Sequence, residues 1–403
     1  MGNLRTMPLS VTNHKALSRV GDIAASCKPL TCAEYFAGIG LVRLGLEKIG
    51  WKVVFANDWA HDKFEMYSAH FRDASQHYKV QDIFSVCHND IPNTLLATAS
   101  FPCIDLSLAG KMKGISGQYS SAFWGFTQIL ENQASKPYLV MLENVTGWLT
   151  SNNGQDFRIT IQELNRLGYV CDVYAIDAAH FLPQSRPRIF VIGVHTAHAD
   201  QNILTLSKRS SSLKTKALEK AIMANQDLRW HFVEVPSLPK KVKTNVSCIV
   251  ERIPDNDVRW WLNDEVNRHL NMMSSVNLDY LKEFQDLPYY SYCTMYRRVR
   301  IGKQRAELRK DGIAGCLRTA RGGSSRQMLV RGGKGTVKMR LMTPREYARL
   351  QGVPDHYPIP SQINQALTGF GDAVCVPVIT WIAENVLSTL VKELQENTLA
   401  LHR

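Results

Sequence analysis

Residues 30–59 read LTCAEYFAGIGLVRLGLEKIGWKVVFANDW, and this stretch decides the fold class. Its apolar start, residues 30–35, predicts a strand, and the glycines that follow predict a tight turn opening a helix over residues 41–49. Gly50 ends that helix, and residues 51–56 predict a second strand that stops at Asn57-Asp58-Trp59. A strand, a glycine turn, a helix and a strand followed by an acid are typical of an α/β domain that binds a nucleotide-containing cofactor.

The glycine turn also discriminates between classes of cofactor. Glycines let the backbone approach a ligand, and an acid after the second strand accepts hydrogen bonds from ribose hydroxyls, as in nicotinamide-dependent oxidoreductases. Here the turn reads Phe36-Ala37-Gly38-Ile39-Gly40 and contains no G-x-G-x-x-G. This spacing disfavours a nicotinamide oxidoreductase, which would bind NAD tightly.

Charged and nucleophilic residues stand at three further strand ends. Residues 98–101 predict a buried strand that runs into Phe101-Pro102-Cys103-Ile104-Asp105, where a cysteine can act as a nucleophile or merely as a small buried hydrophobe. The apolar run 137–142 stops at Glu143-Asn144-Val145, and Gln184-Ser185-Arg186-Pro187-Arg188 abuts the apolar strand 189–193. Because ligands of open α/β sheets bind at the carboxyl ends of the strands, these groups can converge on one pocket.

In order and identity these motifs resemble those of the DNA cytosine 5-methyltransferase family, bacterial restriction-modification type. Phe101-Pro102-Cys103 is similar to the family's Pro-Cys nucleophile loop, Glu143-Asn144-Val145 to its Glu-Asn-Val motif, and the stretch 184–188 to its Gln-x-Arg-x-Arg motif. The resemblance covers about residues 31–195 and 338–385. It implies a Rossmann-like, S-adenosylmethionine-dependent methyltransferase sheet of the α/β class with a second, smaller target-recognition domain.

The resemblance further implies S-adenosylmethionine as the cofactor. Asp58 would hold the ribose, Trp59 would stack on adenine, and Asp82 with Ile83 would meet the adenine amino group. An aromatic residue at a strand end, such as Trp59, can alternatively serve packing alone. The other residues implied at the cofactor are Phe36, Gly38, Ile39, Gly40, Pro102, Asp372 and Ala373.

Three positions depart from the family pattern. Leu41 replaces the last glycine of the cofactor loop, and Asp372 replaces an asparagine, which removes an amide donor. Ile104 replaces the glutamine that commonly follows the nucleophile, which removes a hydrogen bond near the flipped-out base. From Ile104 we expect altered DNA contact rather than lost activity.

The implied catalytic residues are Cys103, Glu143, Arg186 and Arg188. The Cys103 thiolate would add to carbon 6 of a flipped-out cytosine, and the resulting enamine would attack the sulfonium methyl group. Glu143 would meet ring nitrogen 3, and Arg186 or Arg188 would supply a field that favours the thiolate. No side chain is an obvious base for the proton on carbon 5, so a water is an equal candidate.

The net charge of +12 is concentrated in one stretch. Residues 297–340 hold 14 Lys and Arg against two acids, Glu307 and Asp311, so this window accounts for the whole excess. Such a concentration favours a polyanion partner such as nucleic acid over a solvated face that only keeps the protein soluble. The resemblance implies that this partner is double-stranded DNA. The residues expected to contact DNA are Ile104, Arg318, Arg321, Arg326 and Arg331.

The 403 residues, 45% hydrophobic and 21% charged, suit two packed domains. We expect a tail or edge element over residues 1–29, a catalytic and cofactor-binding domain over 30–194, a target-recognition domain over 195–337, and a segment over 338–403 that returns to the catalytic domain. In that last segment, Thr343 and Glu346 predict a capping box with Pro344 in the first helical turn.

Several classes of protein are disfavoured. No window approaches 18 uninterrupted apolar residues, and residues 1–30 lack the apolar core of a secretory signal, so neither a membrane span nor secretion is expected. The nine cysteines, odd in number and without a C-x-x-C pair, indicate a reducing cytoplasm and no structural zinc or other metal. The resemblance implies that this cytoplasm is of the bacterial type. A monomer is expected.

The leading interpretation is a site-specific DNA methyltransferase that methylates carbon 5 of cytosine through a covalent cysteine adduct, as part of a restriction-modification system. One alternative is an RNA (tRNA) cytosine-5 methyltransferase, which the large second domain disfavours. The other is a catalytically silent DNA-binding relative, which the intact Cys103, Glu143 and Arg186 disfavour.

Overall fold

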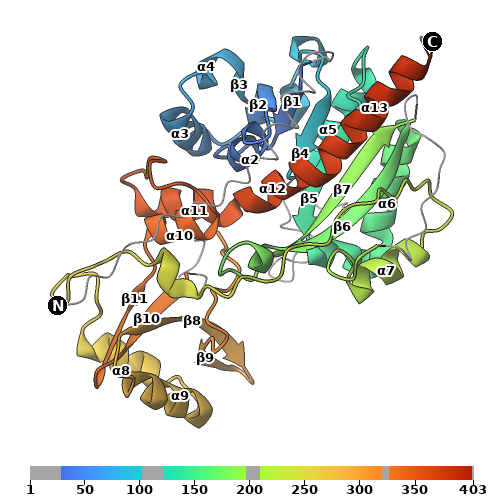
Figure 1. Cartoon of the computed structure of the whole chain (residues 1–403). Helices are drawn as coiled ribbons and strands as arrows, with labels where there is room; N and C mark the ends of the chain where they lie inside the picture. The colour runs from blue at the N-terminus through green and yellow to red at the C-terminus, as the bar shows by residue number, and fades with distance from the viewer. Residues whose placement is uncertain (1–28, 102–120, 197–208, 320–325, 402–403) are drawn as a thin grey trace.

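The structure is a computed structural model that describes residues 29–101, 121–196, 209–319 and 326–401 (Figure 1). Four residues expected in the site, Pro102, Cys103, Ile104 and Arg321, lie outside the described residues.

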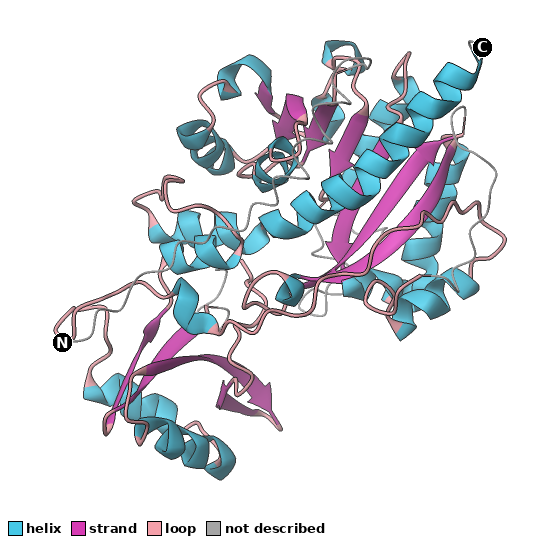
Figure 2. Cartoon of the chain, in the orientation of Figure 1, coloured by secondary structure: helices cyan, strands magenta, loops and turns pink. Residues whose placement is uncertain are grey.

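A sheet of seven strands forms the centre of the larger domain, in the order β3-β2-β1-β4-β5-β7-β6 (Figure 2). The strands are β1 (Thr31–Tyr35), β2 (Lys52–Asp58), β3 (Tyr78–Val80), β4 (Leu96–Ala99), β5 (Leu139–Val145), β6 (Tyr169–Asp177) and β7 (Pro187–His195). The pairs from β3 to β5 are parallel, whereas β7 runs antiparallel to both β5 and β6. The reversed β7 therefore begins at the edge of the sheet where β5 ends.

Helices cover both faces of this sheet. On one face α2 (Leu41–Glu47) packs against the C-terminal helices, and on the other lie α5 (Ser121–Asn132) and α6 (Gln155–Arg166) (Figure 1). Leu46 and Ile379 belong to the first core cluster, and Phe126 and Phe157 to the second. The helices α3 (His61–His70), α4 (Ala74–His77) and α7 (Lys216–Met223) complete the domain.

A second, antiparallel sheet forms the smaller domain, with the strand order β11-β10-β8-β9. Its strands are β8 (Ser291–Arg300), β9 (Lys303–Leu308), β10 (Met328–Gly333) and β11 (Thr336–Leu341), accompanied by α8 (Asn263–Leu270) and α9 (Ser275–Gln285). Met295, Met328, Met339 and Phe284 fill its core. Because β11 completes this sheet, the small sheet extends to Leu341, past residue 337, where we had expected the second domain to end.

The C-terminal segment returns to the larger domain through α10 (Pro344–Leu350), α11 (Ile363–Asp372), α12 (Val376–Ile382), a π-helical turn (Ala383–Leu387) and α13 (Ser388–Leu401). Figure 1 shows α12 and α13 crossing the face of the large sheet. The helical run Ile363–Glu396 is long and apolar enough to cross a membrane, but 67% of its most apolar window is buried inside this fold. Such burial is what a core helix shows.

Local sequence signals and structure agree closely in these elements. The strands expected at residues 30–35, 51–56 and 189–193 and the helix expected at 41–49 are confirmed, with ends displaced by a few residues. The capping box is confirmed as well: Thr343 Oγ1 accepts from the Glu346 N–H at 3.2 Å, and Glu346 Oε2 accepts from the Thr343 N–H at 2.8 Å.

Candidate active site

An acid and a guanidinium meet where β5 ends and β7 begins. In the antiparallel pair of these strands, Val145 is the register partner of Arg188 and Glu143 that of Phe190. Arg188 therefore starts its strand next to Glu143, and its Nε lies 3.0 Å from Glu143 Oε1. Both side chains are largely buried, which strengthens the ion pair relative to one in water.

Arg186, two residues earlier, is buried and serves three separate segments. Its Nη1 donates to Leu317 O at 2.9 Å, its Nη2 donates to Ala373 O at 2.7 Å, and its backbone N–H donates to the Asp177 carboxylate at 2.7 Å. Because these acceptors lie far apart in the sequence, Arg186 joins the larger domain, the smaller domain and the C-terminal segment. Its guanidinium is thus engaged by backbone carbonyls, whereas that of Arg188 is engaged by Glu143.

Gln184 has a similar joining role. Its amide donates to Leu350 O at 2.6 Å at the end of α10, and its carbonyl accepts from the Leu317 N–H at 3.1 Å. The side chain is completely buried. In the Gln-x-Arg-x-Arg motif, Gln184 and Arg186 therefore hold neighbouring segments together, and Arg188 faces Glu143.

Asn144 links this edge to Phe101, the last described residue before Cys103. Its Nδ2 donates to Phe101 O at 3.4 Å, and its Oδ1 accepts from the Val145 N–H at 2.8 Å. Ala99 of the neighbouring parallel strand β4 pairs with Leu142 of β5. The described chain therefore reaches Phe101 beside Asn144, one residue along from Glu143.

A second cysteine, Cys316, lies at the site. Arg186 Nη1 lies 3.3 Å and Arg188 Nη2 lies 3.7 Å from its sulfur. Burial alone would raise the pKa of the Cys316 thiol, but the nearby guanidiniums of Arg186 and Arg188 outweigh it and hold this pKa below its usual value. No local motif marks this cysteine, because its partners lie about 130 residues away.

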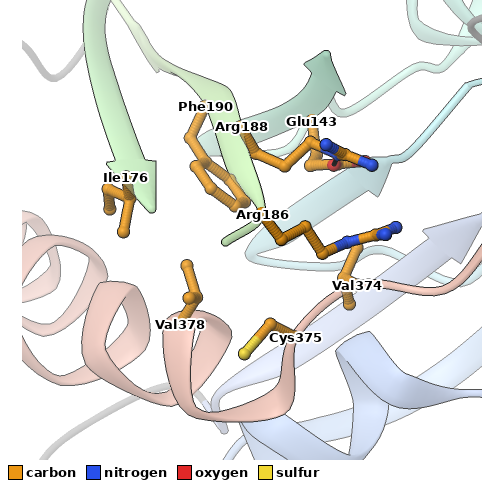
Figure 3. A pocket seen from close by; sticks show the side chains of 8 residues that line it. All are labelled: Glu143, Ile176, Arg186, Arg188, Phe190, Val374, Cys375 and Val378. Carbon is orange, nitrogen blue, oxygen red and sulfur yellow. Dashed lines mark ion pairs between the residues drawn. The ribbon is translucent and has the colours of Figure 1, made fainter. Parts of the chain in front are cut away.

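Figure 3 shows the small pocket between these elements. Arg186 and Arg188 extend from the start of β7 in the same direction, and Glu143 stands beside Arg188. The C-terminal segment closes the other side with Val374 and Cys375. The full lining is Glu143, Ile176, Arg186, Arg188, Phe190, Val374, Cys375 and Val378.

The expected cofactor loop lies at the same end of the large sheet. Phe36, Gly38 and Gly40 all have positive φ, at 55°, 54° and 79°. At Gly40 a Cβ atom would lie 2.7 Å from the Tyr67 ring, so only glycine fits this turn. Asp58 at the end of β2 braces the loop, since its two carboxylate oxygens accept from the Gly38 and Ala60 N–H groups, each at 3.0 Å.

The other expected cofactor residues surround this loop. Trp59 has 65% of its surface exposed, and Asp82 is also exposed, with its carboxylate accepting from the Phe84 N–H at 2.9 Å. Ile83 and Ile39, in contrast, are buried. The backbone carbonyl of Ile39 accepts a hydrogen bond from Tyr357 Oη at 2.7 Å. An exposed indole next to a glycine turn suits a planar base.

Asp372 and Ala373 sit where the C-terminal segment meets both domains. Asp372 accepts from Thr319 Oγ1 at 2.7 Å and lies 3.7 Å from Lys63 Nζ. The carbonyl of Ala373 accepts from Arg186 and from Gln351. The aspartate at this position is therefore used by a hydroxyl and an ammonium group, which an asparagine amide would serve less well.

The basic stretch separates into exposed and internal cations. Arg318 is exposed, and Arg326 is half-buried and bound to Asn364. Arg331 differs from the expectation of a DNA contact: it is buried, its Nη1 donates to Asp255 at 2.6 Å, and it stacks between Trp260 and Tyr290. Arg340 is fully buried and paired with Glu346. Part of the positive charge is thus neutralised inside the small domain.

Comparison with known proteins assigns this arrangement to a family. The sequence model described as "C-5 cytosine-specific DNA methylase" matches residues 30–388. The chain is 29% identical to type II methyltransferase M.SsoII of Shigella sonnei, covering 89% of this chain and 80% of that protein. It is also 29% identical to type II methyltransferase M.HaeII of Haemophilus aegyptius, covering 89% and 92%.

Solved structures share the fold. The crystal structure of S. pombe Dnmt2 methyltransferase aligns with a TM-score of 0.57 and 16% identity, covering 91% of this chain and 99% of that one. The Entamoeba histolytica methyltransferase EhMeth aligns with a TM-score of 0.58 and 14% identity, covering 92% and 99%. At such low identity these alignments speak for the fold alone.

Proposed function

This chain belongs to the C-5 cytosine-specific DNA methylase family, and from that premise we propose that the edge holding Glu143 and Arg188 is the pocket for a flipped-out cytosine. As a family member the chain is a DNA cytosine-5 methyltransferase. The names of its relatives support a role in a type II restriction-modification system. The observation that carries the assignment of the pocket is the buried Glu143–Arg188 ion pair near Phe101, the last described residue before Cys103.

In this proposal Cys103 is the nucleophile. Its thiolate adds to carbon 6 of cytosine, so an S–C bond forms and the 5,6 double bond becomes an enamine. The enamine carbon then takes the methyl group from a sulfonium donor. Loss of the proton on carbon 5, to a base or water, re-forms the double bond and expels the Cys103 thiolate.

Glu143 and Arg188 bind the ring while this happens. The carboxyl group of Glu143 can meet ring nitrogen 3 and the amino group, and Arg188 beside it can donate to the ring carbonyl oxygen. Both contacts strengthen as thiolate addition places negative charge on the ring, which is how they would lower the barrier. Arg186 and Gln184 act indirectly, because they hold the surrounding segments in place.

S-adenosylmethionine is the methyl donor in this proposal. The residues present fit it: a turn of positive-φ residues leaves backbone accessible, Asp58 lies under that turn, and Trp59 offers an exposed ring. Asp58 would accept from ribose hydroxyls, Trp59 would stack on adenine, and Asp82 would accept from the adenine amino group. When bound, the donor supplies an electrophilic methyl group.

Double-stranded DNA is the proposed substrate, because the exposed cations of the small domain suit its phosphates. The target carbon lies inside the duplex, so the nucleotide must swing out to reach Cys103. Arg318, which is exposed, would contact phosphate, whereas Arg331 and Arg340 are paired with Asp255 and Glu346.

The experiment that tests this function uses a duplex containing 5-fluorocytosine. Fluorine on carbon 5 cannot leave as a proton does, so methyl transfer traps the enzyme covalently on the DNA. We expect wild type with S-adenosylmethionine to form this adduct, and Cys103→Ala to bind the duplex without forming it. Absence of an adduct with wild type would contradict the proposal, and methyl transfer to tRNA in place of DNA would redirect it to an RNA substrate.

A further inference from the structure

The hairpin of β8 and β9 extends beyond the rest of the small sheet. Strand β10 pairs with β8 only over residues 291–295, whereas β9 pairs with β8 over residues 295–300. Among the described residues, 296–300 and 303–307 therefore form strand pairs only with each other, as a two-stranded ribbon. Its base is anchored in the small domain, where Ala306 is buried and its N–H donates to Met272 O at 3.2 Å. Figure 1 shows β9 at the edge of the sheet, with β11 at the opposite edge.

One face of this ribbon carries like charges opposite one another. Arg300 pairs across the strands with Lys303, and Arg298 pairs with Arg305. Directly opposed side chains share a face, and like charges there destabilise a hairpin. Glu307 offsets part of this, since it pairs with Arg300 at 2.9 Å and Arg298 at 3.3 Å. One carboxylate for four cations leaves the face strongly positive.

The turn of the ribbon contains a second feature that is unfavourable for folding. Ile301 and Gly302 have φ of 48° and 71°, a two-residue turn with both central residues left-handed. Such type I′ turns favour Asn or Gly, and a β-branched residue is strained there. Ile301 is also 102% exposed, and Val299 nearby is 69% exposed. A strained, fully exposed isoleucine contributes nothing to folding.

The dimensions of the ribbon suit the major groove of DNA. The major groove of DNA is roughly 12 Å wide and 8.5 Å deep and admits a two-stranded ribbon. Five residues of a strand extend about 17 Å, enough to reach the base edges from the sheet. In the groove the cations would lie near phosphates, and an apolar tip would meet base edges such as the thymine methyl group.

We infer that the ribbon of residues 296–307 is the base-reading finger of this methyltransferase, with Ile301 contacting base edges in the recognition sequence and its cationic face contacting phosphates. The inference rests on the proposed function and adds the element that sets its sequence specificity. Edge strands can also carry Lys and Arg merely to prevent aggregation. Protection against aggregation would account for the cations, but it would not account for the exposed side chain of Ile301.

Ile301→Asn separates the two roles. It creates Asn-Gly, the most favourable sequence for this turn, so the hairpin should fold at least as well while its apolar tip is lost. The matched control is Val276→Asn, which removes another exposed apolar side chain, 61% exposed on α9. DNA from cells expressing each protein is bisulfite-sequenced, and the bases flanking methylated cytosines are compared.

We expect wild type and Val276→Asn to share one narrow consensus. Ile301→Asn should lose discrimination roughly tenfold at one or two neighbouring positions, with an unchanged or higher Tm. A consensus for Ile301→Asn identical to that of wild type would overturn the finger while leaving the proposed function intact. If wild type methylated no cytosine, the proposed function would fail and the finger with it.

A second variant tests the cationic face. Lys303→Gln combined with Arg305→Gln should reduce the salt dependence of binding to a duplex of unrelated sequence by about two units of slope. The consensus should stay as in wild type, because phosphate contacts carry no sequence information. An unchanged slope would mean that this face of the ribbon does not contact DNA.

Discussion

Arg188 Nε lies 3.0 Å from Glu143 Oε1, across two neighbouring strands that run in opposite directions. The reversal of β7 brings the start of one strand to the end of the other. The sequence separates these residues by 45 positions, yet they form one buried ion pair close to Phe101, after which the described chain stops short of Cys103.

The first prediction concerns that pair. Glu143→Gln should lower the single-turnover rate of methyl transfer to DNA by about 100-fold or more, because the amide cannot share a proton with ring nitrogen 3. The control is Glu131→Gln, which breaks a surface pair with Arg166 and should leave the rate unchanged. Equal rates for both variants would remove Glu143 from catalysis.

The second prediction concerns Cys316. Because guanidiniums hold its pKa below the usual value, whereas burial raises the pKa of Cys248, the thiolate of Cys316 should form at lower pH. Iodoacetamide labelling, followed by mass spectrometry of the two peptides between pH 6 and pH 10, should show the rate for Cys316 rising first. A later rise at Cys316 would contradict the contacts with Arg186 and Arg188.

The third prediction concerns Glu34, which is fully buried in β1. Burial raises its pKa to about 8, against a weaker opposing effect of Arg43. The folded state therefore keeps a proton that the unfolded state loses above the ordinary glutamate pKa of 4.5, so this group's contribution to stability falls as pH rises towards 8. The slope is about 1.4 kcal/mol per pH unit for one proton.

Urea unfolding of wild type and Glu34→Gln at pH 5, 6.5 and 8 measures this effect. Glutamine resembles the protonated acid and does not titrate, so the variant should gain stability relative to wild type as pH rises. A constant difference between the two proteins would show that Glu34 titrates normally in the fold.

The fourth prediction concerns Arg340. Its Nη1 donates to Glu346 Oε2 at 2.7 Å, and both side chains are fully buried. Arg340→Met should reduce the free energy of unfolding by about 3–5 kcal/mol, because it leaves a buried carboxylate without its partner. Arg268→Met breaks an exposed pair with Glu265 and should cost less than about 1 kcal/mol in the same urea titration.

The fifth prediction concerns Arg318, which is exposed in the segment that contacts Arg186 and Asp372. Arg318→Ala should lower the slope of log binding constant against log salt by about one unit, as expected for one lost phosphate contact. Fluorescence anisotropy with a labelled duplex at several salt concentrations gives the slope. A slope equal to that of wild type would place the DNA elsewhere.

Local patterns in the sequence predicted much of this molecule. The strand at residues 30–35, the glycine turn and the helix after it follow from signals that act within a few residues, and so does the capping box of Thr343 and Glu346. The family motifs gave the chemistry of the candidate site by resemblance. Such signals can be interpreted from the sequence because each depends on neighbouring residues alone.

The sequence could not tell which cations were available to DNA. Residues 297–340 look uniformly basic, but Arg331 and Arg340 are held by Asp255 and Glu346, one of which lies 76 residues away. Nor could it show that Arg186 bonds to backbone at Leu317 and Ala373 while Arg188 faces Glu143.

By itself, then, the sequence determined the α/β class, the order of the strand ends and the kinds of reactive group that stand on them. Only the tertiary structure decided that β7 runs backwards, that Cys316 joins the two arginines, and that residues 296–307 project as a ribbon. The reason is physical: propensities and caps act over a turn or a strand, whereas the direction of a strand and the partner of a buried charge depend on how distant surfaces pack together.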